Sequence, residues 1–200
     1  MNGFEKRRMQ KKKAIIESAI DMFTKYGFKR VSISEIANKA NVSQVTIYNL
    51  FESKQGLKEE VVKELFKRIF DLYDEILESD ENFKEKIESM FSLKMGLLEN
   101  QIMNIVDDLM DPNGSLAKIM EESYDYSISR FFDIIEKGKK EGAIRNDISN
   151  ETIGIYFDMI KSYYYDPKKG HLLKDKKITE ELYRVFWYGL MNHEYLENEK

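Results

Sequence analysis

Apolar residues recur at α-helical spacing through nearly every segment of this chain, and few residues interrupt the pattern. The 200 residues include only 10 Gly and 2 Pro, while 34% are charged and 42% are apolar. This combination favours long helices with one solvated face over short strands joined by turns. No segment shows the alternating pattern of a strand. We therefore expect an all-α fold of about nine helices.

Composition excludes several classes of function. The chain has no Cys and only two His, His171 and His193, which excludes disulfides, thiolate chemistry and a multi-histidine metal centre. No apolar stretch approaches the roughly 20 residues of a membrane span, and no signal-peptide core follows the basic start. Neither a phosphate-binding loop nor a nucleophile motif is recognisable. We expect a cytoplasmic protein that is not an enzyme and holds no metal and no cofactor.

Charge is divided unevenly along the chain. Residues 1–54 contain 11 Lys and Arg against 5 Asp and Glu, a net charge of +6, and the rest contains 21 against 31, a net charge of −10. A basic head on an acidic remainder favours a polyanion as partner of the head. The first residues leave two readings open, contacts to DNA or a solvated tail. They include Lys6, Arg7, Arg8, Lys11, Lys12 and Lys13.

Two short helices are predicted at 33–40 and 44–51. Ser32 and Glu35 have the spacing of a capping box, in which the serine side chain accepts a backbone N–H and the glutamate bonds back. Ser43 is a second N-cap residue, placed directly before the second helix. Two short helices joined by a turn of three or four residues form a helix-turn-helix.

The exposed face of the second helix carries the chemistry. From Ile36 to Phe51 there is no acidic residue, although 36 of the 200 residues are Asp or Glu. Phosphates repel carboxylates, so this face suits a DNA groove, where Gln and Asn bind adenine, Val contacts a thymine methyl group, and hydroxyls and Lys contact phosphates. The alternative is an ordinary polar helix face. The predicted DNA-binding residues are Ser32, Ser43, Gln44, Val45, Thr46, Tyr48, Asn49 and Lys54.

The order of these motifs resembles the TetR family of bacterial transcriptional regulators. The resemblance covers residues 9–69 and rests on a basic helix followed by Ser32-x-x-x-Ile36-Ala37, Val42-Ser43, Ile47-Tyr48-x-x-Phe51 and Ser53-Lys54-x-x-Leu57. Asn41 stands where Gly is usual, and Leu50 stands where a hydrogen-bonding residue is common, which removes one expected phosphate contact.

The resemblance implies both the domain division and the function. It implies a three-helix DNA-binding head at 9–54, with the helix-turn-helix at 32–51, and a larger helical domain at 55–200 that binds an effector and dimerises. The implied function is that of a homodimeric repressor, released from a palindromic operator by a small-molecule effector. The alternative is a DNA-binding or interaction protein of the same fold that is regulated by a protein partner and has no small-molecule pocket.

The helices expected at 150–165 and 179–196 are apolar over most of their circumference. A surface helix needs only one apolar stripe, so both helices must be covered on two sides, either by a partner subunit or as central helices of a monomer. The TetR resemblance also places the dimer interface here. The predicted interface residues are Ile153, Phe157, Ile160, Tyr164, Tyr183, Phe186, Trp187 and Leu190.

The middle helices are rich in Met and aromatic residues. Such residues line ligand pockets, but at helical spacing they more often fill an ordinary core. A pocket for an effector is therefore predicted from the resemblance rather than from these side chains. The candidate pocket residues are Phe91, Met95, Met103, Tyr124 and Phe131.

Overall fold

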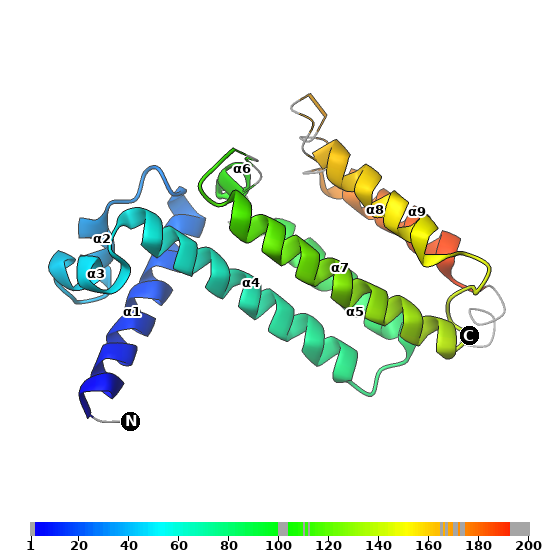
Figure 1. Cartoon of the computed structure of the whole chain (residues 1–200), viewed down its shortest axis with the longest axis horizontal. Coiled ribbons are helices and arrows are strands. Elements are labelled where there is room, and N and C mark those ends of the chain that lie inside the picture. Colours follow the sequence, from blue (N-terminus) through cyan, green and yellow to red (C-terminus); the bar gives the residue numbers. More distant parts are fainter. Residues whose placement is uncertain are drawn as a thin grey trace. The chain divides into compact units, whose positions relative to one another are not determined.

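The computed structural model of the chain is built from helices, and the all-α prediction is confirmed (Figure 1). It describes residues 3–99, 104–109, 111, 113–164, 166, 168–169, 172 and 175–192. No strand occurs within these ranges. The helices are α1 (Gly3–Tyr26), α2 (Ile33–Lys39), α3 (Gln44–Phe51), α4 (Lys54–Glu78), α5 (Phe83–Glu99), α6 (Val106–Leu109), α7 (Ala117–Lys140), α8 (Asn150–Tyr164) and α9 (Lys176–Leu190).

The helix ends follow from local chemistry. Gly27 ends α1 with a φ of 80°, in the left-handed region that glycine adopts without strain. The helix α9 begins at Lys176, three residues before the predicted start, because the Asp175 side chain accepts a hydrogen bond from the backbone of Ile178 at 3.0 Å. At the other end of the chain, the basic start is helical from Gly3 and belongs to α1.

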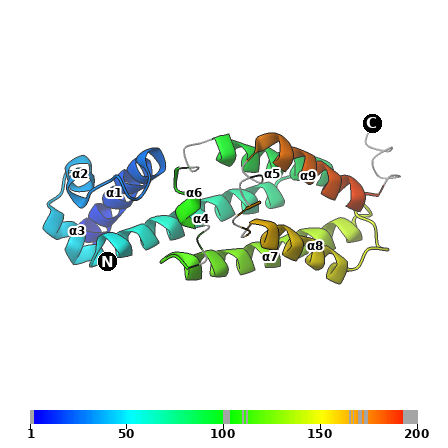
Figure 2. The same cartoon turned by 90° about the horizontal axis from the view of Figure 1, so that it is seen from above.

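The chain divides into two compact units. The first, called the head, comprises residues 1–71 and 99–121, and the second, called the body, comprises residues 72–98 and 122–200. The long helices α4 and α7, both labelled in Figure 2, each contribute residues to both units. The sequence prediction placed the boundary at residue 54, at the start of α4.

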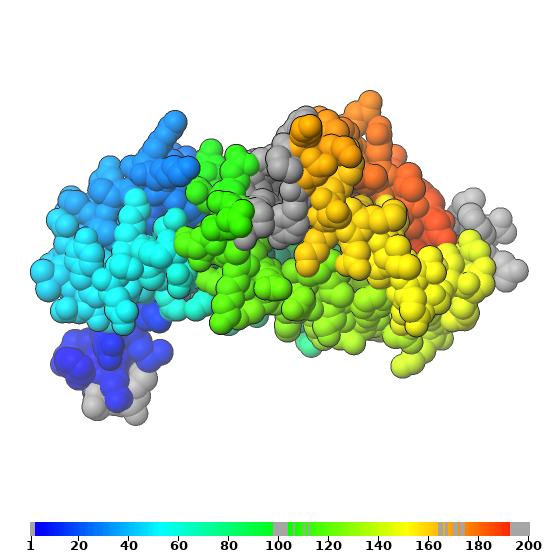
Figure 3. Space-filling model, turned by 45° about the horizontal axis from the view of Figure 1, so that its top comes forward, coloured from blue at the N-terminus to red at the C-terminus, as the bar shows by residue number. Residues whose placement is uncertain are grey.

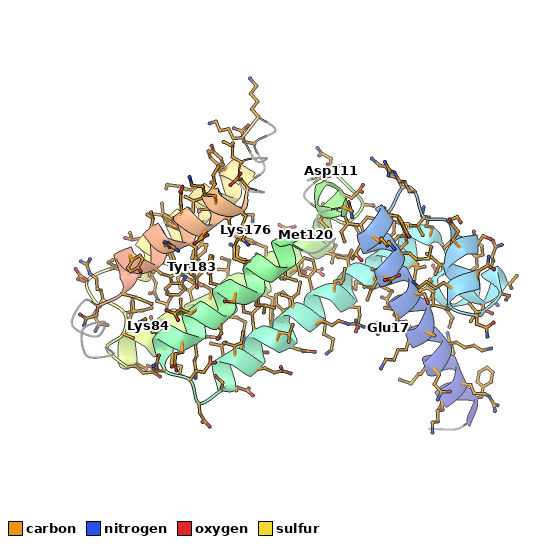
Figure 4. The ribbon with its side chains drawn as sticks, turned by 180° about the vertical axis from the view of Figure 1, so that it is seen from behind. Glu17, Lys84, Asp111, Met120, Lys176 and Tyr183 are labelled. Atoms are coloured by element: carbon orange, nitrogen blue, oxygen red, sulfur yellow. The ribbon has the colours of Figure 1, made fainter. Side chains whose placement is uncertain are left out.

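The head has its own apolar core. Ion pairs tie α1 to α4: both Nη groups of Arg68 donate to the carboxylate of Glu17, which is labelled in Figure 4, and Lys12 Nζ lies 2.7 Å from Glu60 Oε2. The segment 104–120 also contributes to this core, although it is distant in sequence from the first three helices. The buried core residues include Ile15, Phe23, Ile36, Ile47, Phe51, Leu57, Val61, Ile105, Leu109 and Leu116.

The body packs around aromatic side chains. Gly138 on α7 lets the helix approach α5 closely, because a Cβ atom there would lie 2.6 Å from the ring of Phe83. The loop after α7 is held to the end of α9 by two backbone hydrogen bonds, from Arg145 N to Leu190 O and from Asn192 N to Ala143 O, each 2.9 Å long.

Among the described helices, none is both long enough and apolar enough to cross a membrane.

Candidate nucleic-acid interface

The helix-turn-helix is built by the two predicted N-caps. Ser32 Oγ accepts a hydrogen bond from Glu35 N at 3.2 Å, and Glu35 Oε2 accepts one from Ser32 N at 2.7 Å, which confirms the capping box. Ser43 Oγ accepts a hydrogen bond from Thr46 N at 3.1 Å and starts α3. Asn41 adopts a φ of 52° in the turn between the helices, as a tight turn without glycine requires.

The end of α3 depends on a glycine that the sequence analysis missed. A Cβ atom on Gly56 would lie 2.2 Å from the carbonyl oxygen of Phe51, so only glycine allows α4 to start this close to the end of α3. Ser53 supports the same junction, since its Oγ accepts a hydrogen bond from Gly56 N at 3.0 Å. In the sequence, the spacing Ser53-x-x-Gly56 was the signal that could have pointed to this capped junction between α3 and α4.

The two faces of α3 are cleanly separated. Ile47 is completely buried and Phe51 nearly so, which fixes the helix against the head. Gln44 and Asn49 are exposed, and Val45 and Tyr48 remain 65% and 47% exposed. Four of the predicted DNA-binding side chains therefore share one accessible surface that carries no carboxylate. Of the remaining predicted contacts, Ser43 and Thr46 lie at the start of α3, Ser32 caps α2 and Lys54 begins α4.

Ser43 and Thr46 share one hydrogen bond that bears on their role. Their hydroxyl oxygens lie 2.9 Å apart, and either one can be the donor. Each hydroxyl has a single proton, so one proton is used between them and the other is left to donate outward. The pair can therefore offer one hydroxyl donor to a phosphate oxygen without breaking the cap of α3.

Ser32 and Lys54 differ in how available they are. The Ser32 hydroxyl already donates to Glu35 Oε2 at 2.7 Å and accepts from Glu35 N, so its only proton is engaged within the capping box and is not free to donate to a phosphate. Lys54 is half-buried, and burial together with repulsion from Lys58 lowers the pKa of its ammonium group. A phosphate placed beside Lys54 would counteract both causes, because it stabilises the charged form.

Asn104 joins a distant segment of the head to α1. Its Nδ2 group donates to the carbonyl oxygens of Thr24 at 2.8 Å and Lys25 at 3.1 Å, at the C-terminal end of α1 where carbonyls lack helical partners. A sequence separation of about 80 residues leaves no local pattern that would have pointed to this contact.

The structure separates the predicted dimer residues into two groups. Ile153, Trp187 and Leu190 are buried in the body's own core, and Phe157, Tyr183 and Phe186 are packed against it. Ile160 is half-buried, and the side chain of Tyr164 lies outside the described part of the chain. The same two helices expose other apolar side chains, namely Ile155, Met159 and Tyr163 on α8 and Val185 and Tyr188 on α9.

The described residues of the predicted pocket lie in different surroundings. Phe91 stacks on Tyr183 at 4.2 Å between ring centroids, and Phe131 contacts Phe157 at 4.4 Å, so both belong to the aromatic packing of the body. Met95 is buried, and Met103 lies outside the described residues. The ring of Tyr124 lies instead 3.8 Å from Lys161 Nζ of α8.

A capped helix-turn-helix with an acid-free outer face defines a DNA-binding protein of the helix-turn-helix class. Residues 15–61 match the family described as bacterial regulatory proteins, tetR family. The matched segment contains the helix-turn-helix, and this similarity supports a transcriptional regulator of the TetR type.

Individual relatives agree with this assignment over most of the chain. The chain is 25% identical over 181 residues to the uncharacterized HTH-type transcriptional regulator YhgD of Bacillus subtilis, covering 89% of this chain and 95% of YhgD. It is 23% identical over 146 residues to the HTH-type transcriptional repressor KstR2 of Mycolicibacterium smegmatis, covering 70% of each. A transcriptional regulator of Saccharomonospora viridis, solved in complex with choline, has the same fold with a TM-score of 0.66 at 20% identity, covering 91% of this chain and 98% of that one.

Proposed function

We propose that this regulator is a homodimeric repressor that binds a palindromic operator through α3 and is released when a small molecule binds the body. The observation that carries the proposal is the exposed, carboxylate-free face of α3. Ser32 and Ser43 cap the two helices of the helix-turn-helix, and the fully buried Ile47 fixes α3 against the head. The name of KstR2, a repressor, supports the sign of the regulation.

Within this surface the roles divide by chemistry. Gln44 and Asn49 are the base-reading candidates, because a side-chain amide bonds adenine through a donor and an acceptor at once. Val45 is suited to a thymine methyl group. Tyr48, Lys54 and the Ser43–Thr46 hydroxyl pair are suited to phosphates, which position the protein without reading sequence.

An operator selected from a random-sequence library tests these roles. Gln44→Ala or Asn49→Ala should weaken operator binding by about 1–3 kcal/mol for each adenine contact and leave binding to random duplex nearly unchanged. Lys54→Ala should weaken both equally and reduce the slope of log Kobs against log salt by about 0.9. Failure of the wild-type protein to enrich any sequence would contradict the proposal.

The dimer is assigned to the exposed faces of α8 and α9 rather than to the residues predicted from the sequence. Residues Ile155, Met159 and Tyr163 follow each other at steps of four along α8 and remain 61%, 59% and 36% exposed. They line an open groove of about 440 Å³ together with Asp158, Ser162, Asp166 and Lys169. A second copy presenting the same face would bury these side chains around a twofold axis.

Sedimentation analysis tests the dimer assignment. Ile155→Asp combined with Val185→Asp should yield a folded monomer, because both side chains are exposed in the single chain and a charge harms only the interface. A matched variant, Glu151→Lys combined with Glu181→Lys, changes two exposed residues of the same helices and should leave the dimer intact. An unchanged dimer in the first variant would assign the interface elsewhere.

Regulation would run through the segment 104–120 and the helices α5 and α7 that flank it. The segment 104–120 leads from α5 into α7, and its Ile105, Leu109 and Leu116 are buried in the head core. An effector that binds the body more tightly in one arrangement of α5 and α7 would shift this segment and, through Asn104, the end of α1. A thermal-shift screen identifies effectors, and those that raise the melting temperature should also weaken operator binding.

A further inference from the structure

The N-terminal half of α1 is a basic helix that does not pack against the head. Every residue from Gly3 to Lys11 is exposed, and the first buried side chain of α1 is Ile15. At a rise of about 1.5 Å per residue, residues 3–11 extend about 14 Å beyond Lys12, the first residue of α1 that contacts the rest of the head. Figure 3 shows the first turns of α1 projecting from the rest of the head.

The direction of this extension, defined as residues 3–13, is fixed at its base. Lys12 Nζ lies 2.7 Å from Glu60 Oε2 on α4 and 5.8 Å from the ring centroid of Phe51, the last residue of α3. The extension therefore leaves the head beside the C-terminal end of the proposed recognition helix.

The extension carries six cations and one carboxylate, that of Glu5, which gives it a net charge of +5. The acidic groups of the packed part of α1 have partners: Glu17 binds Arg68, and Asp21 binds Lys39. In contrast, five of the six cations of the extension, all except Lys12, form no ion pair with a described residue. These are Lys6, Arg7, Arg8, Lys11 and Lys13.

Such a segment gains little from forming a helix alone. Isolated helices of about 12 residues are marginal in water, like charges at i and i+4 such as Arg7 and Lys11 repel, and cations near a helix N-terminus oppose its dipole. A polyanion beside the helix removes the last two penalties.

We propose that residues 3–13 form a second DNA-binding element that contacts phosphates flanking the site read by α3. The proposal rests on the proposed function for the operator, but its phosphate contacts require only duplex DNA. A membrane surface is the less suitable polyanion, because Phe4 and Met9 are five residues apart and point about 140° away from each other around a helix, so they form no apolar face. Self-association is disfavoured because two such helices carry like charges.

The test compares two variants with equal charge loss. The extension variant changes Lys6, Arg7, Arg8 and Lys11 to Ala, the residue that best preserves a helix. The control variant changes four exposed body lysines to Ala. These are Lys140, Lys168, Lys176 and Lys177.

Binding is measured on a random duplex of about 60 base pairs across a range of salt concentrations, and by hydroxyl-radical footprinting on the selected operator. The extension variant should bind about tenfold more weakly at ~0.15 M salt, with the slope of log Kobs against log salt reduced by about 0.9 for each phosphate that the protein no longer neutralises. Its footprint should be shorter at both ends, and its preference for operator over random duplex should be unchanged. The control variant should match the wild type in slope and footprint.

Equal slopes and footprints for the two variants would overturn the inference. Loss of binding to phosphatidylserine vesicles with unchanged binding to duplex would overturn it in favour of a membrane surface. If the wild type selects no operator but the extension variant still loses affinity for random duplex, the proposed function fails and the inference stands.

Discussion

The helix α3 and the pair α8 and α9 differ in how well their sequences predict which side of the helix is buried. In α3 the structure buries Ile47 and Phe51 and leaves exposed a face on which the polar side chains Gln44 and Asn49 accompany Val45 and Tyr48. In α8 and α9 apolar residues lie on all sides, and the structure buries Ile153 and Trp187 while it exposes Ile155 and Tyr188. A one-sided pattern identifies its own buried face, whereas an all-round pattern leaves that choice to the neighbouring helices.

The largest expected effect tests this contrast on two adjacent residues of α9. Trp187 is 7% exposed and contacts the rings of Phe186 and Tyr183 at centroid distances of 5.2 and 5.9 Å. Trp187→Ala should lower the free energy of unfolding by about 3–5 kcal/mol, because it leaves a large cavity in the core. The measurement is urea denaturation at a fixed protein concentration.

Tyr188→Ala provides the control, since Tyr188 is 63% exposed. In the single chain this change should stay within about 0.5 kcal/mol, and its main effect should be a weaker dimer. If both variants lose the same stability under conditions where the protein is monomeric, the assignment of buried and exposed faces in α9 is wrong.

The second effect makes the same comparison in α3. Ile47→Ala should lower the free energy of unfolding by about 2–5 kcal/mol, because Ile47 is completely buried in the head core. Val45→Ala, two residues earlier and 65% exposed, should leave stability nearly unchanged and reduce only the preference for the operator. Calorimetry and operator titration of the same preparations separate the two outcomes. A destabilised Val45→Ala variant would contradict the proposed surface.

A smaller effect concerns the link between α1 and the segment 104–120. Asn104→Ala removes two hydrogen bonds to α1 carbonyls and should cost about 1 kcal/mol of stability. Asn38→Ala is the matched control, since it changes an exposed asparagine of α2 in the same unit. Denaturation curves that coincide for the two variants would show that the Asn104 contact contributes nothing. If regulation runs through this link, Asn104→Ala should also reduce the effect of the effector on operator binding.

The smallest expected effect is the pH dependence of the α2 cap. Hydrogen bonds from the Ser32 hydroxyl and backbone lower the pKa of Glu35 below its ordinary value. A lowered pKa in the folded state adds stability above the pKa of the unfolded chain, and this stability is lost as the pH falls through the folded pKa. Glu35→Gln should therefore be less stable than the wild type at neutral pH, and the difference should disappear on acidification.

Ser32→Ala supplies the control for this measurement. It removes the side-chain hydrogen bond that contributes most to the shift, so Glu35→Gln in that background should show a smaller pH-dependent difference. An identical pH dependence in both backgrounds would assign the acid sensitivity to other groups.

The helices and the helix-turn-helix were largely predictable because their signals are local. Caps such as Ser32 and Ser43 depend on neighbours within four residues, and they are found as predicted. Gly56 was equally local but was missed, because the need for glycine becomes visible only when the carbonyl of Phe51 is placed beside it.

Contacts between distant residues were not predictable in the same way. The pairing of Asn104 with the end of α1 depends on how the chain folds back over about 80 residues, and no spacing encodes it. The predicted pocket residues Phe91 and Phe131 joined the aromatic packing of the body, because Met and aromatic side chains look alike in sequence whether they line a pocket or fill a core.

Residue order alone was enough to establish that the chain is helical, where the helix-turn-helix lies and which face of α3 is free of acidic groups. These properties follow from short-range hydrogen bonding and from the period of one helix. Packing in three dimensions was needed to show which sides of α8 and α9 face outward, that Ile105, Leu109 and Leu116 belong to the head core, and that the residues from Gly3 to Lys11 belong to α1 but stay exposed. Those outcomes depend on which surfaces remain after helices far apart in sequence have packed together.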